Sequence, residues 1–486
     1  MDRLQDPEFR QPGGPDMAAR GAFAPLDAAP ATPPRAPSGV RRWGTAGVLI
    51  AALAVAYSLV RLAKEPASMV PLPSVAAHVV SSMLAPSTTA IGSVSSGVSS
   101  GVTPAVLRGR QARQSSADEA KLLEVYGLLA TGESAAALAM AQQLVAQTPG
   151  FGLGQLAYAD LLSAQVDPDS GFAAVPTPFA DLAQDRLREL KAEARARVQA
   201  AAFSPPPGTV PAAFVTLAPN VKHAIAVDVT RSRVYVIENG AQGPTLIREF
   251  YASIGKQGIS KYAAGDQRTP LGVYFATRQV PTSTLPARYG TRALVLNYPN
   301  PYDKLEGRGG DGIWLHGVPA IDYTRAPWAT DGCVALGNSY MEELANYVDF
   351  QGTPIVIAEN LEWAAPATLR ERHAAFLTTF DQWRSVRDAG DPSSQLAFYS
   401  TAVQVPEVPP ASPAWQQRLR EFREARKGTR APAIDKLSVV HWQEREFLMV
   451  VTFTEGDAGA AGNKTRRQYW LREGSQWRIF YERLLG

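Results

Sequence analysis

The spacing of hydrophobic positions changes several times along the 486-residue chain. Residues 43–60 (WGTAGVLIAALAVAYSLV) carry no charge, are apolar on every side and have basic residues at both ends. A helix of this length just crosses about 30 Å of hydrocarbon, so we predict a transmembrane helix. A buried core helix is the alternative. A cleaved signal peptide fits less well, because residues 1–42 precede the segment.

Two segments beside this helix show no pattern of a folded core. Residues 1–42 are rich in Pro, Ala and Gly without a sustained apolar period, and we predict a disordered tail. Basic residues on both sides of the helix leave its orientation open, and we place the tail in the cytoplasm because of the function argued below. From Pro66 to Leu107 there is no Asp, Glu, Lys or Arg. This composition is typical of flexible spacers, so residues 61–117 are predicted to be a linker.

Residues 118–204 have the period of helices. Three amphipathic runs are separated at Gly132 and at Pro149–Gly150, and a charged run over Phe179–Ala202 ends before Pro205. Small Ala residues recur where two helices would approach closely. The spacing resembles one and a half tetratricopeptide (TPR-like) units, and a plain helical hairpin is the open alternative.

Residues 205–360 change to short runs of alternating apolar residues. Gly and Pro occur in nearly every connection, which favours an all-β sandwich or barrel over repeated βαβ units. One clear helix is predicted inside this region, over Asn338–Val348. The expected strands are AIAVDVTRSRVYVIENG with a turn at Thr230–Ser232, LIREFYASIG, GVYFATRQV, ALVLNY, GIWLHGV and TPIVIAE.

Residues 361–486 place helical runs before three long alternating strands, which predicts an α+β cone. Apolar residues at helical intervals should pack onto the curved sheet and give a core independent of the rest. About 125 residues is a usual domain size, so we expect this unit to fold alone. The helix positions are Leu369, Phe376, Phe380 and Trp383, and the sheet positions are Val439, Trp442, Phe447, Met449, Val451 and Trp470.

Composition narrows the function classes. The formal net charge is only +3, and no arginine-rich stripe with interleaved aromatic residues is present, so we expect no nucleic-acid binding. Cys333 is the only cysteine. A single cysteine excludes intramolecular disulfides, a CxxC redox pair and a cysteine-rich zinc site, and leaves an inert thiol or a nucleophile.

Candidate chemistry concentrates at Cys333 and His316. Cys333 lies in TDGCVAL, read as a Gly-containing turn that leads into a helix, where backbone N–H groups lower a thiol pKa and bind an oxyanion. His316 ends the hydrophobic strand of GIWLHGV. An imidazole within hydrogen-bond reach stabilises a thiolate nucleophile. From spacing alone, a buried structural cysteine and a core histidine remain the alternative.

The order of these motifs resembles the L,D-transpeptidase catalytic domain, also called the YkuD fold. That family has His-Gly, a loop, and then Ser/Thr-x-Gly-Cys-Val/Ile. GKQGISKYAAGDQRTPLGVYFAT and LNYPNPYD also resemble family blocks, in the family order, across about Ala224–Glu359. The resemblance implies a β-rich domain.

The resemblance also implies roles for the motif residues. Cys333 would attack the acyl carbonyl of a peptidoglycan stem peptide and form a thioester. His316 would act as general base and later assist the acceptor amine, while Gly332 and neighbouring amides donate to the oxyanion. The motif also includes Thr330 and Asp331. No cofactor or metal is needed.

Two departures leave roles open. Asp331 stands where many members have His, and Ala335 stands where many have Arg. The form resembles a proteobacterial branch, and the group that orients His316 is undetermined. Candidates for binding the substrate, including its carboxylate, are Gly317, Arg268, Lys261 and Arg308.

The C-terminal unit resembles NTF2-like domains, which form a cone whose mouth holds a ligand or a partner. We therefore predict a single-pass inner-membrane L,D-transpeptidase with periplasmic domains that acts on stem peptides. Open alternatives are hydrolysis at the same site, attachment or release of a wall-linked protein, and a non-catalytic wall-binding scaffold. A wall-linked protein or a division or elongation partner would bind through the helical and NTF2-like regions.

Overall fold

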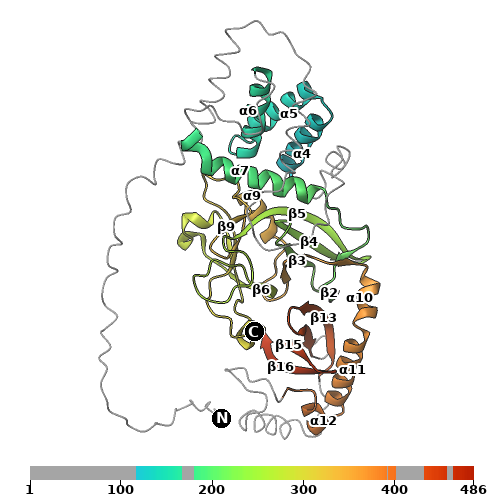
Figure 1. Cartoon of the computed structure of the whole chain (residues 1–486). Coiled ribbons are helices and arrows are strands. Elements are labelled where there is room, and N and C mark those ends of the chain that lie inside the picture. The colour runs from blue at the N-terminus through green and yellow to red at the C-terminus, as the bar shows by residue number, and fades with distance from the viewer. Residues whose placement is uncertain (1–115, 167–179, 391, 401–431, 457–463, 486) are drawn as a thin grey trace, which may run out of the picture. The chain divides into compact units, whose positions relative to one another are not determined.

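A computed structural model describes residues 116–166, 180–390, 392–400, 432–456 and 464–485 (Figure 1). The expected tail (1–42), the transmembrane helix (43–60) and nearly all of the linker (61–117) lie outside these residues. Residues 413–428, the last of the helical runs predicted before the C-terminal strands, lie outside them as well. Within the described ranges, no helix is both long enough and apolar enough to cross a membrane.

Four helices form where the helical period predicted them: α4 (Ala117–Ala130), α5 (Ser134–Gln147), α6 (Gly152–Val166) and α7 (Ala180–Ala201). The Ser116 side chain accepts from the amide of Glu119 and caps α4. Gly132 separates α4 from α5 at a φ of +79°, a conformation that glycine adopts readily. Ala137 and Ala141 are fully buried in the shared core, as expected where helices approach closely. The TPR-like resemblance stays a prediction.

The middle of the chain forms a nine-stranded sheet in the order β10-β8-β7-β6-β11-β3-β4-β5-β9. An additional antiparallel pairing of β10 with β5 closes the sheet, which confirms the barrel over the sandwich. The strands of this part of the chain are β1 (Val210–Pro211), β2 (Phe214–Thr216), β3 (His223–Asp228), β4 (Arg233–Gly240), β5 (Gly243–Gly255), β6 (Gly272–Gln279), β7 (Ala293–Leu296), β8 (Trp314–His316), β9 (Trp328–Thr330), β10 (Val334–Leu336), β11 (Pro354–Ala358) and β12 (Trp363–Ala364).

Within the described residues, two short α-helices lie between strands of this barrel in the sequence. α9 (Asn338–Ala345) is the helix that the sequence predicts, although it ends earlier than expected. A second helix, α8 (Pro301–Leu305), was not predicted. Asn300 and Asp303 cap it reciprocally, and Pro301 occupies its first turn, so local chemistry alone explains this short element.

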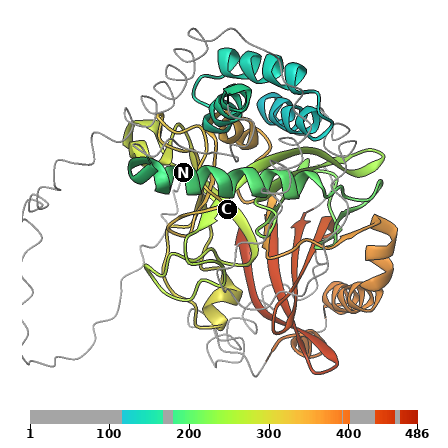
Figure 2. The same ribbon diagram turned by 45° about the horizontal axis from the view of Figure 1, so that its top comes forward.

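The C-terminal part contains α10 (Pro366–Arg372), α11 (Ala374–Asp388), α12 (Pro392–Leu396) and β13 to β16. The first of the three expected strands is in fact a hairpin, because residues 444–446 separate β13 (Ile434–Gln443) from β14 (Phe447–Glu455). β15 (Lys464–Glu473) and β16 (Gln476–Leu485) follow. Figure 2 shows these strands in red with the orange helices beside them.

Two hydrophobic clusters divide the C-terminal sheet. Phe376, Phe380 and Trp383 of α11 pack with Met449 and Trp470 in a cluster of their own, as the helical spacing predicted. By contrast, Leu369, Trp442 and Leu448 do not join this separate cluster and belong to the hydrophobic core of the barrel. The sheet is also extended by β2, from within the range predicted for the catalytic domain, because β2 pairs with β13.

Candidate active site

His316 lies on one strand of the closed sheet, and Cys333 lies next to the start of the neighbouring parallel strand. His316 is the last residue of β8, and Cys333 directly precedes β10. The register pairs Val334 with Leu315 and Ala335 with His316. Both candidate catalytic side chains are largely buried, His316 at 2% and Cys333 at 9% exposure. The pairing of β8 with β10 therefore brings together two motifs that are separated in the sequence.

The imidazole of His316 is oriented by the backbone that follows it. Its Nδ1 donates to the carbonyl oxygen of Gly317 at 2.5 Å, since a carbonyl only accepts. Asn338 holds this backbone, because its Oδ1 accepts from Val318 N at 3.1 Å and its Nδ2 donates to Val318 O at 2.9 Å. The ring of Tyr289 lies edge-on against the imidazole with centroids 4.9 Å apart. Gly317, predicted as a substrate contact, thus supplies the group that orients His316.

Burial controls the charge of both groups. Desolvation lowers the pKa of His316 to about 4; its hydrogen bond to Gly317 opposes this shift, and the nearby cations Arg325 and Arg288 add to it. Desolvation also raises the pKa of the Cys333 thiol to about 11. At neutral pH the resting pair is therefore a neutral imidazole and a protonated thiol.

The expected lowering of the thiol pKa by a helix N-terminus is wrong. Cys333 precedes the strand β10, and α9 begins only at Asn338. The Cys333 thiol donates to the carbonyl oxygen of Gly312 at 3.4 Å. A helix dipole acts within its first turn, so α9 does not stabilise a thiolate here.

The turn before Cys333 is fixed by two threonine hydroxyls. Thr330 Oγ1 accepts from Gly332 N at 3.1 Å and donates to Cys333 O at 2.7 Å. Thr269 Oγ1 donates to Gly332 O at 3.0 Å and accepts from Gly255 N at 2.9 Å. The Gly332 amide, predicted to bind an oxyanion, is therefore engaged with Thr330 in this state.

Asp331 points to the surface beside this turn. Its side chain is 76% exposed and pairs with Lys256 Nζ at 3.0 Å, while Gln267 Nε2 donates to the same oxygen at 3.3 Å. Its charge adds to the raised pKa of Cys333, after desolvation. Asp331 is therefore not the residue that orients His316.

The cations predicted to hold a substrate carboxylate have other partners. Lys261 is 3% exposed and donates to Asp266 at 2.7 Å and to Ala263 O at 2.9 Å. The guanidinium of Arg308 is buried between Asp303 at 3.2 Å and Glu444 at 2.5 Å. Both side chains are thus engaged with protein partners in this state, and their predicted role in substrate binding stays a prediction.

Arg268 is the exposed member of that set. It donates to the carbonyl oxygen of Ile259 at 3.0 Å, and its own carbonyl oxygen lies against Gly332. Its predicted role in substrate binding stays a prediction.

Sequence reasoning missed the cations that face His316. Arg288 lies over the ring of Tyr289 at 4.8 Å, and Arg325 Nη2 reaches the carbonyl oxygen of Arg288 at 3.5 Å. Neither guanidinium forms an ion pair with a carboxylate within the residues that the structure describes. No sequence motif includes Arg288 or Arg325. Thr269 lies inside the motif GKQGISKYAAGDQRTPLGVYFAT, and Asn338 begins the helix predicted after TDGCVAL, so the sequence did mark these two positions. Across the same described residues, no cluster of His, Cys, Asp and Glu could hold a metal ion.

Comparison with known proteins gives the family of the central region. Residues 222–357 match YkuD, the L,D-transpeptidase catalytic domain. The chain is similar to the solved structure of Bdellovibrio bacteriovorus Bd1075, with 23% identity over 57% of this chain and 98% of that chain and a TM-score of 0.47. It is similar to the helical cell shape determining protein Pgp2 from Campylobacter jejuni, with 20% identity, 54% and 91% coverage and a TM-score of 0.42.

An L,D-transpeptidase from Mycobacterium smegmatis is a more distant neighbour, with 18% identity over 28% of this chain and 58% of that chain and a TM-score of 0.20. No curated protein matches the chain. The NTF2-like character of the C-terminal part and the proteobacterial branch stay predictions. The match covers both motifs that carry His316 and Cys333, and residues 222–357 are therefore a YkuD L,D-transpeptidase catalytic domain.

Proposed function

We propose that the protein is an L,D-transpeptidase that acylates Cys333 with a peptidoglycan stem peptide and transfers the acyl group to an amine. One observation carries this proposal. Within the matched range, the paired strands β8 and β10 place His316, oriented by Gly317, next to the strand that Cys333 precedes.

The proposed acylation begins with a neutral pair. Because Nδ1 of His316 carries the hydrogen donated to Gly317, the lone pair of Nε2 accepts the thiol proton. Sulfur attacks the acyl carbon as that proton leaves, since a free thiolate is disfavoured by a pKa near 11. The leaving amine takes the proton from His316, and a thioester remains on Cys333.

Transfer reverses these proton movements. An acceptor amine gives its proton to Nε2 of His316 and attacks the thioester carbon, and the sulfur leaves and is reprotonated. Water in place of the amine gives hydrolysis at the same site. The Gly332 amide would donate to the oxyanion after its hydrogen bond to Thr330 opens.

A wall-acting catalytic domain works outside the cytoplasm, and we propose that residues 43–60 anchor it to the inner membrane as one transmembrane helix. The proposal rests on the eighteen uncharged residues and their basic flanks. A reporter enzyme that works only in the periplasm, fused after Gly486, should be active. Activity of a reporter that works only in the cytoplasm would reverse the orientation.

Intact mass spectrometry tests the proposed reaction directly. Incubation with purified muropeptides should add an acyl mass to the wild-type chain and none to Cys333→Ala. Crosslinked products would then identify transpeptidation, and shortened stems would identify hydrolysis. A wild-type chain that never gains an adduct, and yields no products, would instead support the non-catalytic scaffold.

A further inference from the structure

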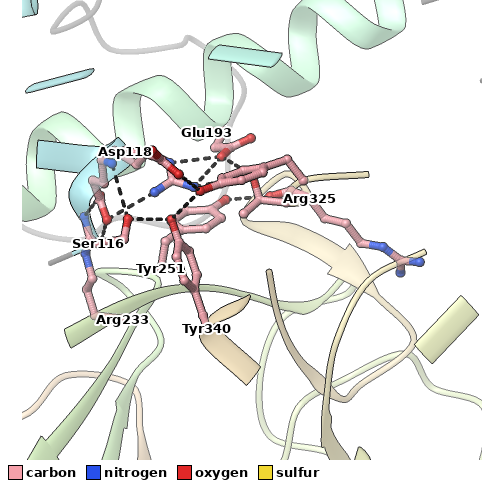
Figure 3. Close-up of polar contacts among 11 residues, drawn as sticks. Ser116, Asp118, Glu193, Arg233, Tyr251, Arg325 and Tyr340 are labelled. Atoms are coloured by element: carbon pink, nitrogen blue, oxygen red, sulfur yellow. Dashed lines mark hydrogen bonds and ion pairs between the residues drawn. The ribbon is translucent and has the colours of Figure 1, made fainter. Parts of the chain in front are cut away.

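Of three consecutive residues between His316 and Cys333, two are hydrogen-bonded to the helical region and the third to strand β5 of the barrel. Figure 3 labels their partners Asp118, Glu193 and Tyr251. Tyr323 donates to Asp118 Oδ2 of α4 at 2.6 Å. Thr324 Oγ1 donates to Glu193 Oε1 of α7 at 2.5 Å. The carbonyl oxygen of Arg325 accepts from Tyr251 at 2.8 Å. The segment that joins the two candidate catalytic motifs is therefore hydrogen-bonded at each of these three positions.

Glu193, the partner of Thr324, belongs to a cluster of four buried charged residues, Glu119, Glu193, Arg197 and Arg233. Glu119 of α4 pairs with Arg233 of β4 at 2.5 Å and with Arg197 of α7 at 3.2 Å. Arg197 also pairs with Glu193 at 2.7 Å, and all four residues are at most 3% exposed. Burial alone would raise the pKa of Glu119, but the two guanidinium groups lower it to about 2, so the carboxylate stays ionised.

The buried ion pairs restrict how α4, α7 and β4 can pack against one another. A buried charge without its partner is strongly destabilising, so α4, α7 and β4 must meet in one register. Arg197 lies 4.1 Å from the centre of the Tyr251 ring, which links the cluster to the residue that holds Arg325. Figure 3 shows the Arg325 side chain extending away from the cluster while its backbone stays attached.

We propose that the helical region is part of the catalytic apparatus, because α4 and α7 hold Tyr323 and Thr324 and thereby position the segment that joins His316 to Cys333. Tyr323 and Thr324 are positioning residues. The effect on peptide acylation rests on the proposed function, whereas the effect on the environment of Cys333 does not.

The double variant Tyr323→Phe/Thr324→Val tests this proposal in the full chain. It removes both hydroxyls but keeps the ring that packs on Phe151 and leaves the charge cluster paired. Asp118 keeps its bond from Thr148. Released from the helices, the segment should expose the thiol, and alkylation of Cys333 by iodoacetamide should become about threefold faster or more. Acylation by a stem peptide should fall on the order of tenfold, because small misplacements are costly in catalysis.

Thr353→Val is the matched control. Thr353 is a buried threonine whose hydroxyl accepts from Asp349 N and donates to Tyr347 O, both within the catalytic domain. Both rates should stay at the wild-type value in this control. Thermal unfolding establishes that each variant is folded, and Thr324→Val alone replaces the double variant if that chain does not fold.

The outcomes separate the two proposals. Faster alkylation with slower acylation supports the positioning role. Faster alkylation with no acylation of any chain, wild type included, supports the positioning role and overturns the proposed function. Wild-type rates of alkylation and acylation in the folded variant, or equal changes in Thr353→Val, overturn the positioning role.

Discussion

Nδ1 of His316 lies 2.5 Å from the carbonyl oxygen of Gly317, the next residue in the chain. In many sites a carboxylate orients the catalytic imidazole, and here a backbone carbonyl does so. A neutral carbonyl fixes the tautomer without adding the negative charge that would raise the pKa of the ring. Burial can therefore keep that pKa low, and His316 stays a neutral base across the neutral range.

The first prediction concerns the acid limit of activity. His316 accepts a proton only when neutral, and its pKa is about 4 against an ordinary value of 6.5. The acylation rate of Cys333 should therefore hold as the pH falls below 6.5 and decline only towards 4. The measurement is the rate of adduct formation by mass spectrometry across this range. A decline centred near 6.5 would contradict the prediction.

Arg325→Gln tests the origin of that low limit. Among the described residues, the Tyr289 ring and the Gly317 carbonyl contact the imidazole of His316, and the charges of Arg325 and Arg288 lower its pKa. Removing one cation should raise the pKa of His316, so the acid limit should move to higher pH. Arg384→Gln on α11, where Arg384 pairs with Asp381, is the control and should leave the limit unchanged.

The second prediction concerns the nucleophile. Cys333→Ser should abolish acylation, because a serine hydroxyl paired with one histidine and no acidic third member is poorly activated. The carbonyl of Gly317 does not replace that acid, since it carries no charge to stabilise an imidazolium. The check is adduct formation and muropeptide products, with thermal unfolding to establish that the variant is folded. Full activity of the serine variant would rule out the mechanism.

Local patterns predicted most elements, while pairing between distant segments accounts for the misses. Gly132 and Pro149–Gly150 separate the first three helices as expected, since breaker residues act locally. The strand β10 between Cys333 and the predicted helix at Asn338 was not predicted, because its pairing with β8 and β5 cannot be seen in a short window of sequence. The hairpin at 444–446 was missed because alternation continues through both of its strands.

The candidate site shows the same contrast between residues marked by local motifs and residues brought together by distant contacts. Local motifs singled out His316 and Cys333 as candidates, and the pairing of β8 with β10 brings these two motifs together. Arg308 was proposed as a substrate contact from its charge alone, but the fold supplies it with Asp303 and the distant Glu444. Conversely, Arg325 has no motif, and only the folded chain brings it near His316. Burial of the thiol is likewise a property of the whole barrel.

The third prediction concerns the turn at Gly332. This residue has a φ of +123°, and a Cβ there would lie 2.7 Å from the carbonyl oxygen of Arg268. Gly332→Ala should therefore displace the turn before Cys333, with an activity loss on the order of a hundredfold. Gly208→Ala is the control, because φ is +72° there and nothing lies within 4 Å of the added Cβ. Equal losses of acylation in the two variants would refute the role of this turn.

The fourth prediction concerns the buried charge cluster. Glu119→Gln leaves Arg197 and Arg233 buried without their shared carboxylate, which should cost about 3–5 kcal/mol of unfolding free energy. Glu124→Gln, at an exposed position of the same helix, should cost less than about 0.5 kcal/mol. Urea unfolding of both variants measures the difference. Similar stabilities would show that the cluster adds no net stabilisation.

The last prediction concerns the C-terminal part, which the sequence suggested would fold alone. Its sheet takes β2 as an edge strand, and Trp442 and Leu448 share the core of the barrel. Arg467 also donates to Gln351 O at 2.5 Å and lies 3.2 Å from the centre of the Phe275 ring.

A fragment of residues 361–486 would lose these partners and expose one apolar face of its sheet. We expect this fragment to aggregate or to unfold without cooperativity, whereas a chain of residues 116–486 should unfold cooperatively. Circular dichroism during thermal unfolding distinguishes the two behaviours. A cooperative transition of the short fragment would show that the α11 core alone, built on Phe376, Phe380 and Trp383, is sufficient for folding.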